Sequence, residues 1–105
     1  MKLIDKATYK EIELILLNAQ NEDLPDNTKQ ALKELHDFFY GSLHYEFIKA
    51  YYFNRYKYKY SCPNVADLFK KIYHDLYIEE PTLYQIKKEV IYKAAMIFYK
   101  NGVLK

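Results

Sequence analysis

Four side chains in one short stretch combine the groups that proteins use to contact nucleic acid. They are a phenol, an amide and two ammonium groups: Tyr84, Gln85, Lys87 and Lys88. Such groups can contact both base edges and phosphates. The stretch therefore predicts a nucleic-acid contact. The alternative interpretation is a polar helix face in contact only with water.

Two amphipathic helices are expected to position these groups. The second should start at Pro81, because proline's fixed φ is already helical and its missing N–H would have no partner there. The first should run from 65 to about 76 and join the second through Tyr77-Ile78. Two helices joined by a tight turn predict a helix-turn-helix over about residues 63–101. The second helix has apolar residues every three or four positions, which predict one buried stripe: Leu83, Ile86, Val90, Ala94 and Ile97.

Composition favours a small all-α domain. The 105 residues are 50% hydrophobic and 29% charged, which is typical of a globular chain rather than a disordered one. Two glycines and three prolines leave few turns, and so favour helices over a many-stranded sheet. We expect a single domain, a compact bundle of about five helices, in which a helical N-terminal part, 1–53, precedes the helix-turn-helix.

The N-terminal part should hold three helices. Thr8 and Glu11 have capping-box spacing, which predicts a helix from there to about residue 20. A second helix should span about 28–40. Gly41-Ser42 can end it and cap the next, although a continuous helix bent at that glycine fits the same residues. The apolar residues expected on the buried faces are Ile12, Ile15, Leu16, Ala19, Leu32, Leu35, Phe39, Leu43, Phe47, Ile48 and Tyr51.

Capping signals also occur in the C-terminal half. Ser61 or Cys62 is expected to cap the first helix of the pair, with Pro63 in its first turn. Gly102 stands where a C-terminal helix cap belongs.

The segment 54–60 alternates basic and aromatic residues. Arg55, Lys57 and Lys59 would share one face of an extended strand and tyrosines the other. The segment could be a basic ribbon along a phosphate backbone, and we include its three basic residues among the candidate DNA contacts. The alternative is an extended connector whose tyrosines pack on the domain.

Charge is distributed unevenly along the chain. Residues 1–50 carry six basic and nine acidic side chains, a net −3, whereas residues 51–105 carry ten basic and five acidic ones, a net +5. The total is the formal +2. The basic half contains the proposed helix-turn-helix, as an electrostatic match to DNA requires.

The C-terminal half resembles a known family over about residues 47–100. The residues that carry the resemblance are Phe47-Ile48, Tyr51-Tyr52-Phe53, Val65-Ala66, Phe69, Ile78, Thr82-Leu83-Tyr84, Lys87-Lys88 and Ile91. Their order is similar to the region-4-like helix-turn-helix of sigma factors, and most of all to small phage and prophage transcriptional regulators of the ArpU/RinA type. Glu79 and Glu80 depart from that pattern, in which serine and a basic residue are commoner.

The resemblance implies a role for each polar residue of the second helix. Thr82 would donate to a phosphate or cap the helix, and Lys87 would reach backbone phosphate. Tyr84, Gln85 and Lys88 would face the major groove, where glutamine can read adenine and lysine guanine.

Other chemistry has little support in the sequence. His36, His44 and His74 lack the spacing of a zinc site. His36-Asp37 and His44 with Glu46 could sit near one another between helices, but a satisfied interhelical or surface histidine is the favoured interpretation. Two glycines could hardly build a phosphate-binding loop. We therefore expect no enzyme activity, no metal and no cofactor.

The chain should be cytoplasmic. Its single cysteine suits a reducing compartment. No signal peptide and no apolar run of about 20 residues is present, so no membrane contact is expected.

These observations predict a DNA-binding transcriptional regulator of phage or prophage type. A homodimer is expected from the apolar run 12–17 and the many tyrosines, and RNA polymerase or another protein is a further expected partner. The alternative function is a small helical adaptor or inhibitor that binds another protein through Glu79, Glu80 and tyrosines, without DNA.

Overall fold

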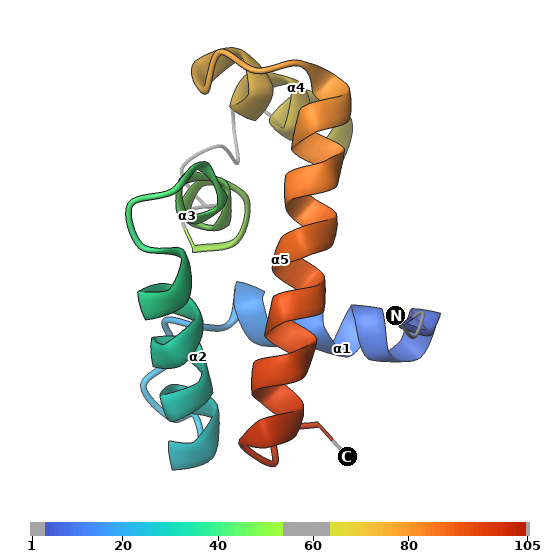
Figure 1. Ribbon diagram of the computed structural model, residues 1–105. Coiled ribbons are helices and arrows are strands. Elements are labelled where there is room, and N and C mark those ends of the chain that lie inside the picture. Colours follow the sequence, from blue (N-terminus) through green and yellow to red (C-terminus); the bar gives the residue numbers. More distant parts are fainter. Residues whose placement is uncertain (1–3, 54–63, 105) are drawn as a thin grey trace.

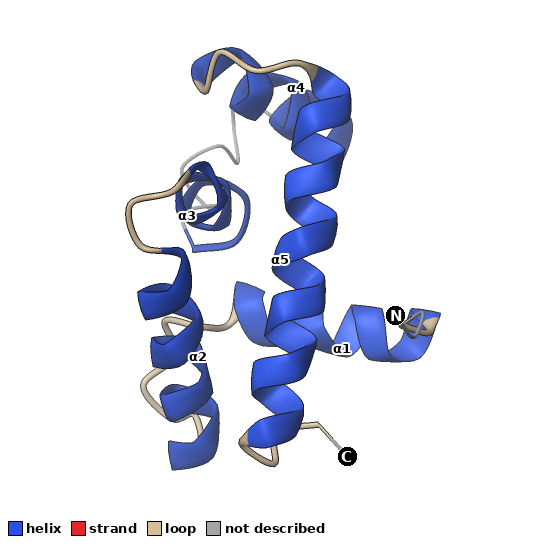
Figure 2. Cartoon of the chain, viewed as in Figure 1, coloured by secondary structure: helices blue, strands red, loops and turns tan. Residues whose placement is uncertain are grey.

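All the regular secondary structure in the described part of the chain is helical. The structure is a computed structural model, and it describes residues 4–53 and 64–104. The helices are α1 (Lys6–Leu17), α2 (Asp26–Phe39), α3 (Leu43–Ile48), the π-helix η1 (Lys49–Phe53), α4 (Val65–Asp75) and α5 (Glu80–Lys100). Figure 2 shows no strand among these residues. The prediction of an all-α bundle of about five helices is confirmed.

The long helix α5 is the axis around which the others pack. Figure 1 shows α2 and α3 along one side of α5, α1 crossing it, and α4 lying across its N-terminal end. The predicted stripe is buried throughout, and four further residues widen it. The added residues are Ile91, Ala95, Phe98 and, from the C-terminal tail, Leu104. A helix that is apolar on this much of its circumference has to lie inside the bundle.

The start of α1 differs from the prediction. Asp5 is the N-cap, and its Oδ1 accepts a hydrogen bond from the Thr8 amide at 2.7 Å. The predicted capping box at Thr8 and Glu11 is therefore wrong, because the helix begins almost one turn earlier. A short carboxylate side chain satisfies the free amides of the first turn as well as a threonine would.

The start of α4 also differs. Asn64 is the N-cap, with its Oδ1 accepting from the Asp67 amide at 2.8 Å. The predicted cap at Ser61 or Cys62 is therefore wrong, and the first turn of α4 starts at Val65, after Pro63, which lies outside the described residues. Asparagine is among the strongest N-cap residues, and an acidic residue three positions later complements the helix dipole.

The predicted break between the second and third helices is confirmed. Gly41 has φ +80°, which ends α2, and the Ser42 Oγ accepts from the Tyr45 amide at 3.2 Å to cap α3. One continuous helix is thereby excluded. The third helix then widens into η1, which was not predicted, and this π-turn buries both Tyr51 and Tyr52. A π-turn changes the direction in which the side chains point, compared with a continuous α-helix.

The two C-terminal helices are joined by the four residues 76–79. Tyr77 has φ +57°, the left-handed conformation, and its side chain is 96% exposed. The predicted extent of the first helix, 65 to about 76, and the C-terminal cap at Gly102 are both confirmed.

Candidate functional site

The N-terminal half of α5 presents most of the predicted contact residues. Thr82, Tyr84, Gln85 and Lys88 are exposed, and Leu83 and Ile86 between them are buried. The Tyr84 ring leans on Phe69 of α4 with ring centroids 4.5 Å apart, and it remains 57% exposed. Helical spacing thus puts a phenol, an amide and an ammonium group on one accessible face.

Lys87 does not share that face. Its side chain is only 19% exposed, with the ammonium 3.7 Å from Glu13 Oε2 on α1 and 3.4 Å from the Tyr51 hydroxyl. The ammonium also lies over the Tyr51 ring, 4.9 Å from its centroid. The expectation that Lys87 projects outward is therefore wrong. Its position four residues after Leu83 places it at the edge of the buried stripe.

The surroundings of Lys87 keep it charged. Burial alone would lower its pKa, but the oxygens of Tyr51, Tyr9 and Glu13 outweigh burial and raise the pKa above its ordinary value. Burial raises the pKa of Tyr9, with Lys87 opposing the shift. Lys87 is thus an internal cation shared among α1, η1 and α5 rather than a free phosphate ligand.

Glu13 completes this internal cluster. Its Oε2 accepts a hydrogen bond of 2.8 Å from the Tyr52 hydroxyl, and burial followed by this carboxylate raises the pKa of Tyr52. No local sequence pattern indicates the cluster, because Lys87 and Tyr51 are 36 residues apart along the chain, and Tyr52 and Glu13 are 39 apart. This cluster of polar contacts holds η1 against α1 and α5.

A second long-range pair borders the exposed face. His44 Nε2 lies 2.8 Å from Glu89 Oε2, and the Gln85 amide donates to Glu89 Oε1 at 3.1 Å. The hydrogen bond with His44, followed by that from Gln85, holds the pKa of Glu89 below its ordinary value. His44 is thus a satisfied interhelical histidine, as the sequence favoured, and Glu46 pairs with Lys49 at 3.2 Å. His36 pairs with the neighbouring Asp37 at 3.1 Å.

Carboxylates interrupt the exposed face. Glu79 and Glu80 are exposed where α5 begins, and Glu89 lies one helical turn beyond Gln85. In the described part of the chain, Lys88 is therefore the accessible cation among the candidate residues. The other basic candidates, Arg55, Lys57 and Lys59, and the predicted extended segment 54–60 lie outside the described residues, as does Cys62.

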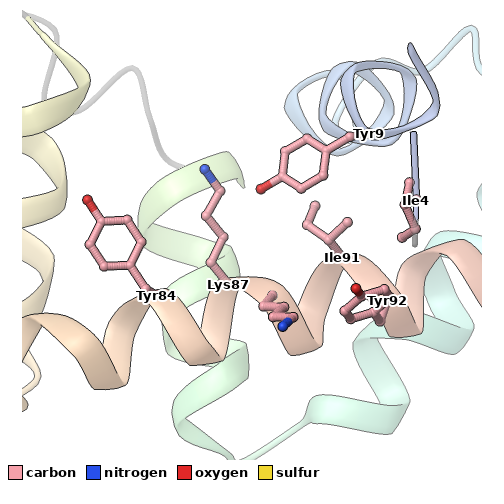
Figure 3. Close-up of a pocket in the computed structure, with 7 residues that line it drawn as sticks. Ile4, Tyr9, Tyr84, Lys87, Ile91 and Tyr92 are labelled. Atoms are coloured by element: carbon pink, nitrogen blue, oxygen red, sulfur yellow. The ribbon is translucent and has the colours of Figure 1, made fainter. Parts of the chain in front are cut away.

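A groove opens beside this face, between α1 and α5. It has a volume of about 350 Å³ and is lined by Ile4, Tyr9, Tyr84, Lys87, Lys88, Ile91 and Tyr92. Figure 3 shows the Tyr9 side chain pointing from α1 toward α5 and the Lys87 side chain pointing from α5 toward Tyr9. Tyr84 lies at one end of the groove. The groove thus shares Tyr84 and Lys88 with the exposed face.

The residues that the structure describes offer no metal site. They contain no group of three His, Cys, Asp or Glu side chains placed to hold a metal ion. His74 stacks on Tyr73 at 5.1 Å and lies apart from the groove lining. Across 4–53 and 64–104, no helix is both long enough and apolar enough to span a bilayer.

Comparison with protein-family models, with curated proteins and with solved structures finds no match for this chain. The resemblance to phage regulators of the ArpU/RinA type therefore stays a prediction.

Proposed function

We propose that the chain binds double-stranded DNA through α4, the turn 76–79 and the N-terminal half of α5, as a cytoplasmic transcriptional regulator of phage or prophage type. The observation that carries this proposal is the exposure of Tyr84, Gln85 and Lys88 on a helix anchored by Leu83 and Ile86. An amide and an ammonium group on one helix face match the base edges of the major groove.

Lys87 is not a suitable position at which to test this proposal, because its side chain is internal. A substitution there would disturb the contacts with Glu13 and Tyr51 as well as any DNA contact. The informative variants are Gln85→Ala and Lys88→Ala, which alter exposed side chains. Lys33→Ala on α2 is the matched control, because it removes one exposed positive charge from another helix.

The test is a mobility-shift titration on DNA from the chain's own genomic neighbourhood at two salt concentrations. Wild type is expected to bind more weakly as salt rises, and Lys88→Ala to reduce the salt slope by about 1. Gln85→Ala should reduce the preference for particular fragments, and Lys33→Ala should behave as wild type. Absence of binding at low salt, or equal loss in Lys33→Ala, would overturn the proposal.

A homodimer and contact with RNA polymerase belong to the same proposal. In the apolar run of α1, Ile12 and Leu16 are buried in the chain's own core, while Leu14 is 57% exposed and available to a second copy. Light scattering across a concentration series should show a dimer. A monomer at high concentration would contradict that part.

A protein-binding adaptor is the second candidate function. Glu79 and Glu80 are exposed beside Tyr77 and Tyr84, which makes this end of the molecule acidic and aromatic. The double variant Glu79→Gln/Glu80→Gln separates the two candidates. Removing carboxylates beside phosphates should tighten DNA binding, whereas an adaptor that uses them would show no DNA binding in either form.

A further inference from the structure

The groove between α1 and α5 continues onto the outer face of α1. A second hollow of about 500 Å³ is lined by Ile4, Lys6, Ala7, Tyr9 and Lys10, and it shares Ile4 and Tyr9 with the first. Because they share these two residues the two hollows adjoin, and together they make one candidate site lined from Tyr84 on α5 to Lys10 on α1. We call it the α1–α5 groove.

The lining of the α1–α5 groove is apolar and aromatic at its centre. Ile4 and Ile91 are flanked by the phenol rings of Tyr9 and Tyr92 (Figure 3). The volume of the first hollow falls within the range of about 300–1,000 Å³ that is usual for ligand pockets. Such a lining suits an aliphatic or aromatic side chain better than a sugar–phosphate backbone.

Among the described residues that line the two hollows, the charged ones are all lysines: Lys6, Lys10, Lys87 and Lys88. Lys6 and Lys10 are exposed and four residues apart, so their like charges lie on one face of α1 and repel each other. Lys88 is exposed at the other end, 5.9 Å from the Tyr92 ring centroid. The Glu13 carboxylate, which lies beside Lys87, already accepts a hydrogen bond from Tyr52. An acidic partner would relieve the repulsion.

We propose that the α1–α5 groove docks an acidic segment of a partner protein, which inserts an apolar or aromatic side chain between Tyr9 and Tyr92 and places carboxylates near Lys6, Lys10 and Lys88. Charge complementarity selects this occupant, and the aliphatic centre of the groove supplies the anchor site. The proposal stands apart from DNA binding. Because Tyr84 and Lys88 belong to both surfaces, a docked acidic segment would exclude DNA from them.

The test uses a fluorescein-labelled peptide with a central Phe-Leu pair flanked on both sides by Asp and Glu, titrated with the full chain. Binding is followed by fluorescence anisotropy. Two companion peptides separate the contributions: one replaces the central pair with serines, and the other replaces the acids with lysines. The first peptide is expected to bind, and both companions to bind at least about tenfold more weakly, a difference of about 1.4 kcal/mol.

Two charge-reversed variants provide matched controls. Lys6→Glu/Lys10→Glu reverses the pair in the groove, and Lys29→Glu/Lys33→Glu reverses an exposed pair of identical spacing on α2. The first should weaken the acidic peptide about tenfold and the second by less than about twofold. Both change exposed side chains and should keep the wild-type circular dichroism spectrum.

The location of the peptide is read from amide chemical shifts. Changes are expected at Ile4, Tyr9 and Ile91. No binding of the acidic peptide, equal binding of its serine-centred companion, equal loss in the two variants, or shifts confined to another face would each overturn the proposal. The peptide assay contains no nucleic acid, so its outcome is independent of the mobility-shift result.

Discussion

Two helix ends in this chain close with the same pair of hydrogen bonds but with different residues. After α4, the Ile78 amide donates to the Tyr73 carbonyl and the Tyr77 amide to the His74 carbonyl, both at 3.1 Å. After α5, the Val103 amide donates to Phe98 at 2.8 Å and the Gly102 amide to Tyr99 at 3.2 Å. This is the Schellman motif, which places its C′ residue in the left-handed region.

Glycine occupies that position after α5, whereas tyrosine occupies it after α4. The left-handed conformation costs a residue with a Cβ about 1–2 kcal/mol. Because the Tyr77 side chain is 96% exposed, its contacts within the described residues offset little of this cost. A strained, solvent-facing aromatic residue at the turn is consistent with a contact to a partner.

Tyr77→Gly is therefore expected to stabilise the protein. The free energy of unfolding, measured by urea denaturation, should rise by about 1 kcal/mol, since glycine adopts this φ without a steric penalty. Gly102→Ala makes the reverse change at the equivalent position after α5, and it should lower the free energy of unfolding by about 1 kcal/mol. Among the described residues, the nearest heavy atom to a Cβ at this position is Asn27 Nδ2, 3.9 Å away, so the cost is one of backbone conformation. A destabilised Tyr77→Gly would contradict the argument.

Helix α3 contacts α5 through a polar pair as well as through apolar packing. His44 at the start of α3 meets Glu89 in the middle of α5, with the carboxylate also accepting from Gln85. The pairing orients the α5 face that carries Gln85. It depends on ionised Glu89, and so on pH.

The contribution of Glu89 to stability should be lost in acid. Its folded pKa lies below the ordinary 4.5, mainly through the hydrogen bond with His44. The contribution is therefore complete above pH 4.5 and disappears as the pH falls through the lower folded value. In urea denaturation, Glu89→Gln should be less stable than wild type near neutral pH, and the difference should shrink below pH 4.5. Glu22→Gln, an exposed carboxylate in the loop before α2, should track wild type throughout.

The whole molecule depends on α5. Helices α1, α2, α3 and α4 all contact it. Loss of packing along α5 should therefore reach every part of the bundle. We expect one cooperative unfolding transition, with helix content and tyrosine fluorescence changing together.

Phe98→Ala tests this expectation. Phe98 is completely buried, and removing its ring should lower the free energy of unfolding by about 3–5 kcal/mol. Tyr99→Ala alters a neighbouring aromatic residue that is 49% exposed, and its cost should stay below about 1 kcal/mol. The measurement is denaturation followed by both signals. Separate midpoints for helix content and fluorescence would contradict a single cooperative unit.

Local patterns in the sequence were sufficient for much of this fold. The all-helical class, the buried stripe of α5, the break at Gly41 and the cap at Gly102 follow from helical periodicity and from the conformations that glycine permits. The errors at the starts of α1 and α4 arose where several good capping residues lie within one turn. Their local signals are nearly equal there, so packing selects between them.

Part of the candidate site could likewise be predicted from local sequence patterns, and part could not. Exposure of Tyr84, Gln85 and Lys88 was predictable, because spacing along one helix determines which residues share a face. The inward position of Lys87, the His44–Glu89 pair and the α1–α5 groove were decided only by tertiary structure. Each brings together side chains from segments at least 35 residues apart. Sequence spacing cannot specify such contacts, because they depend on how whole helices cross.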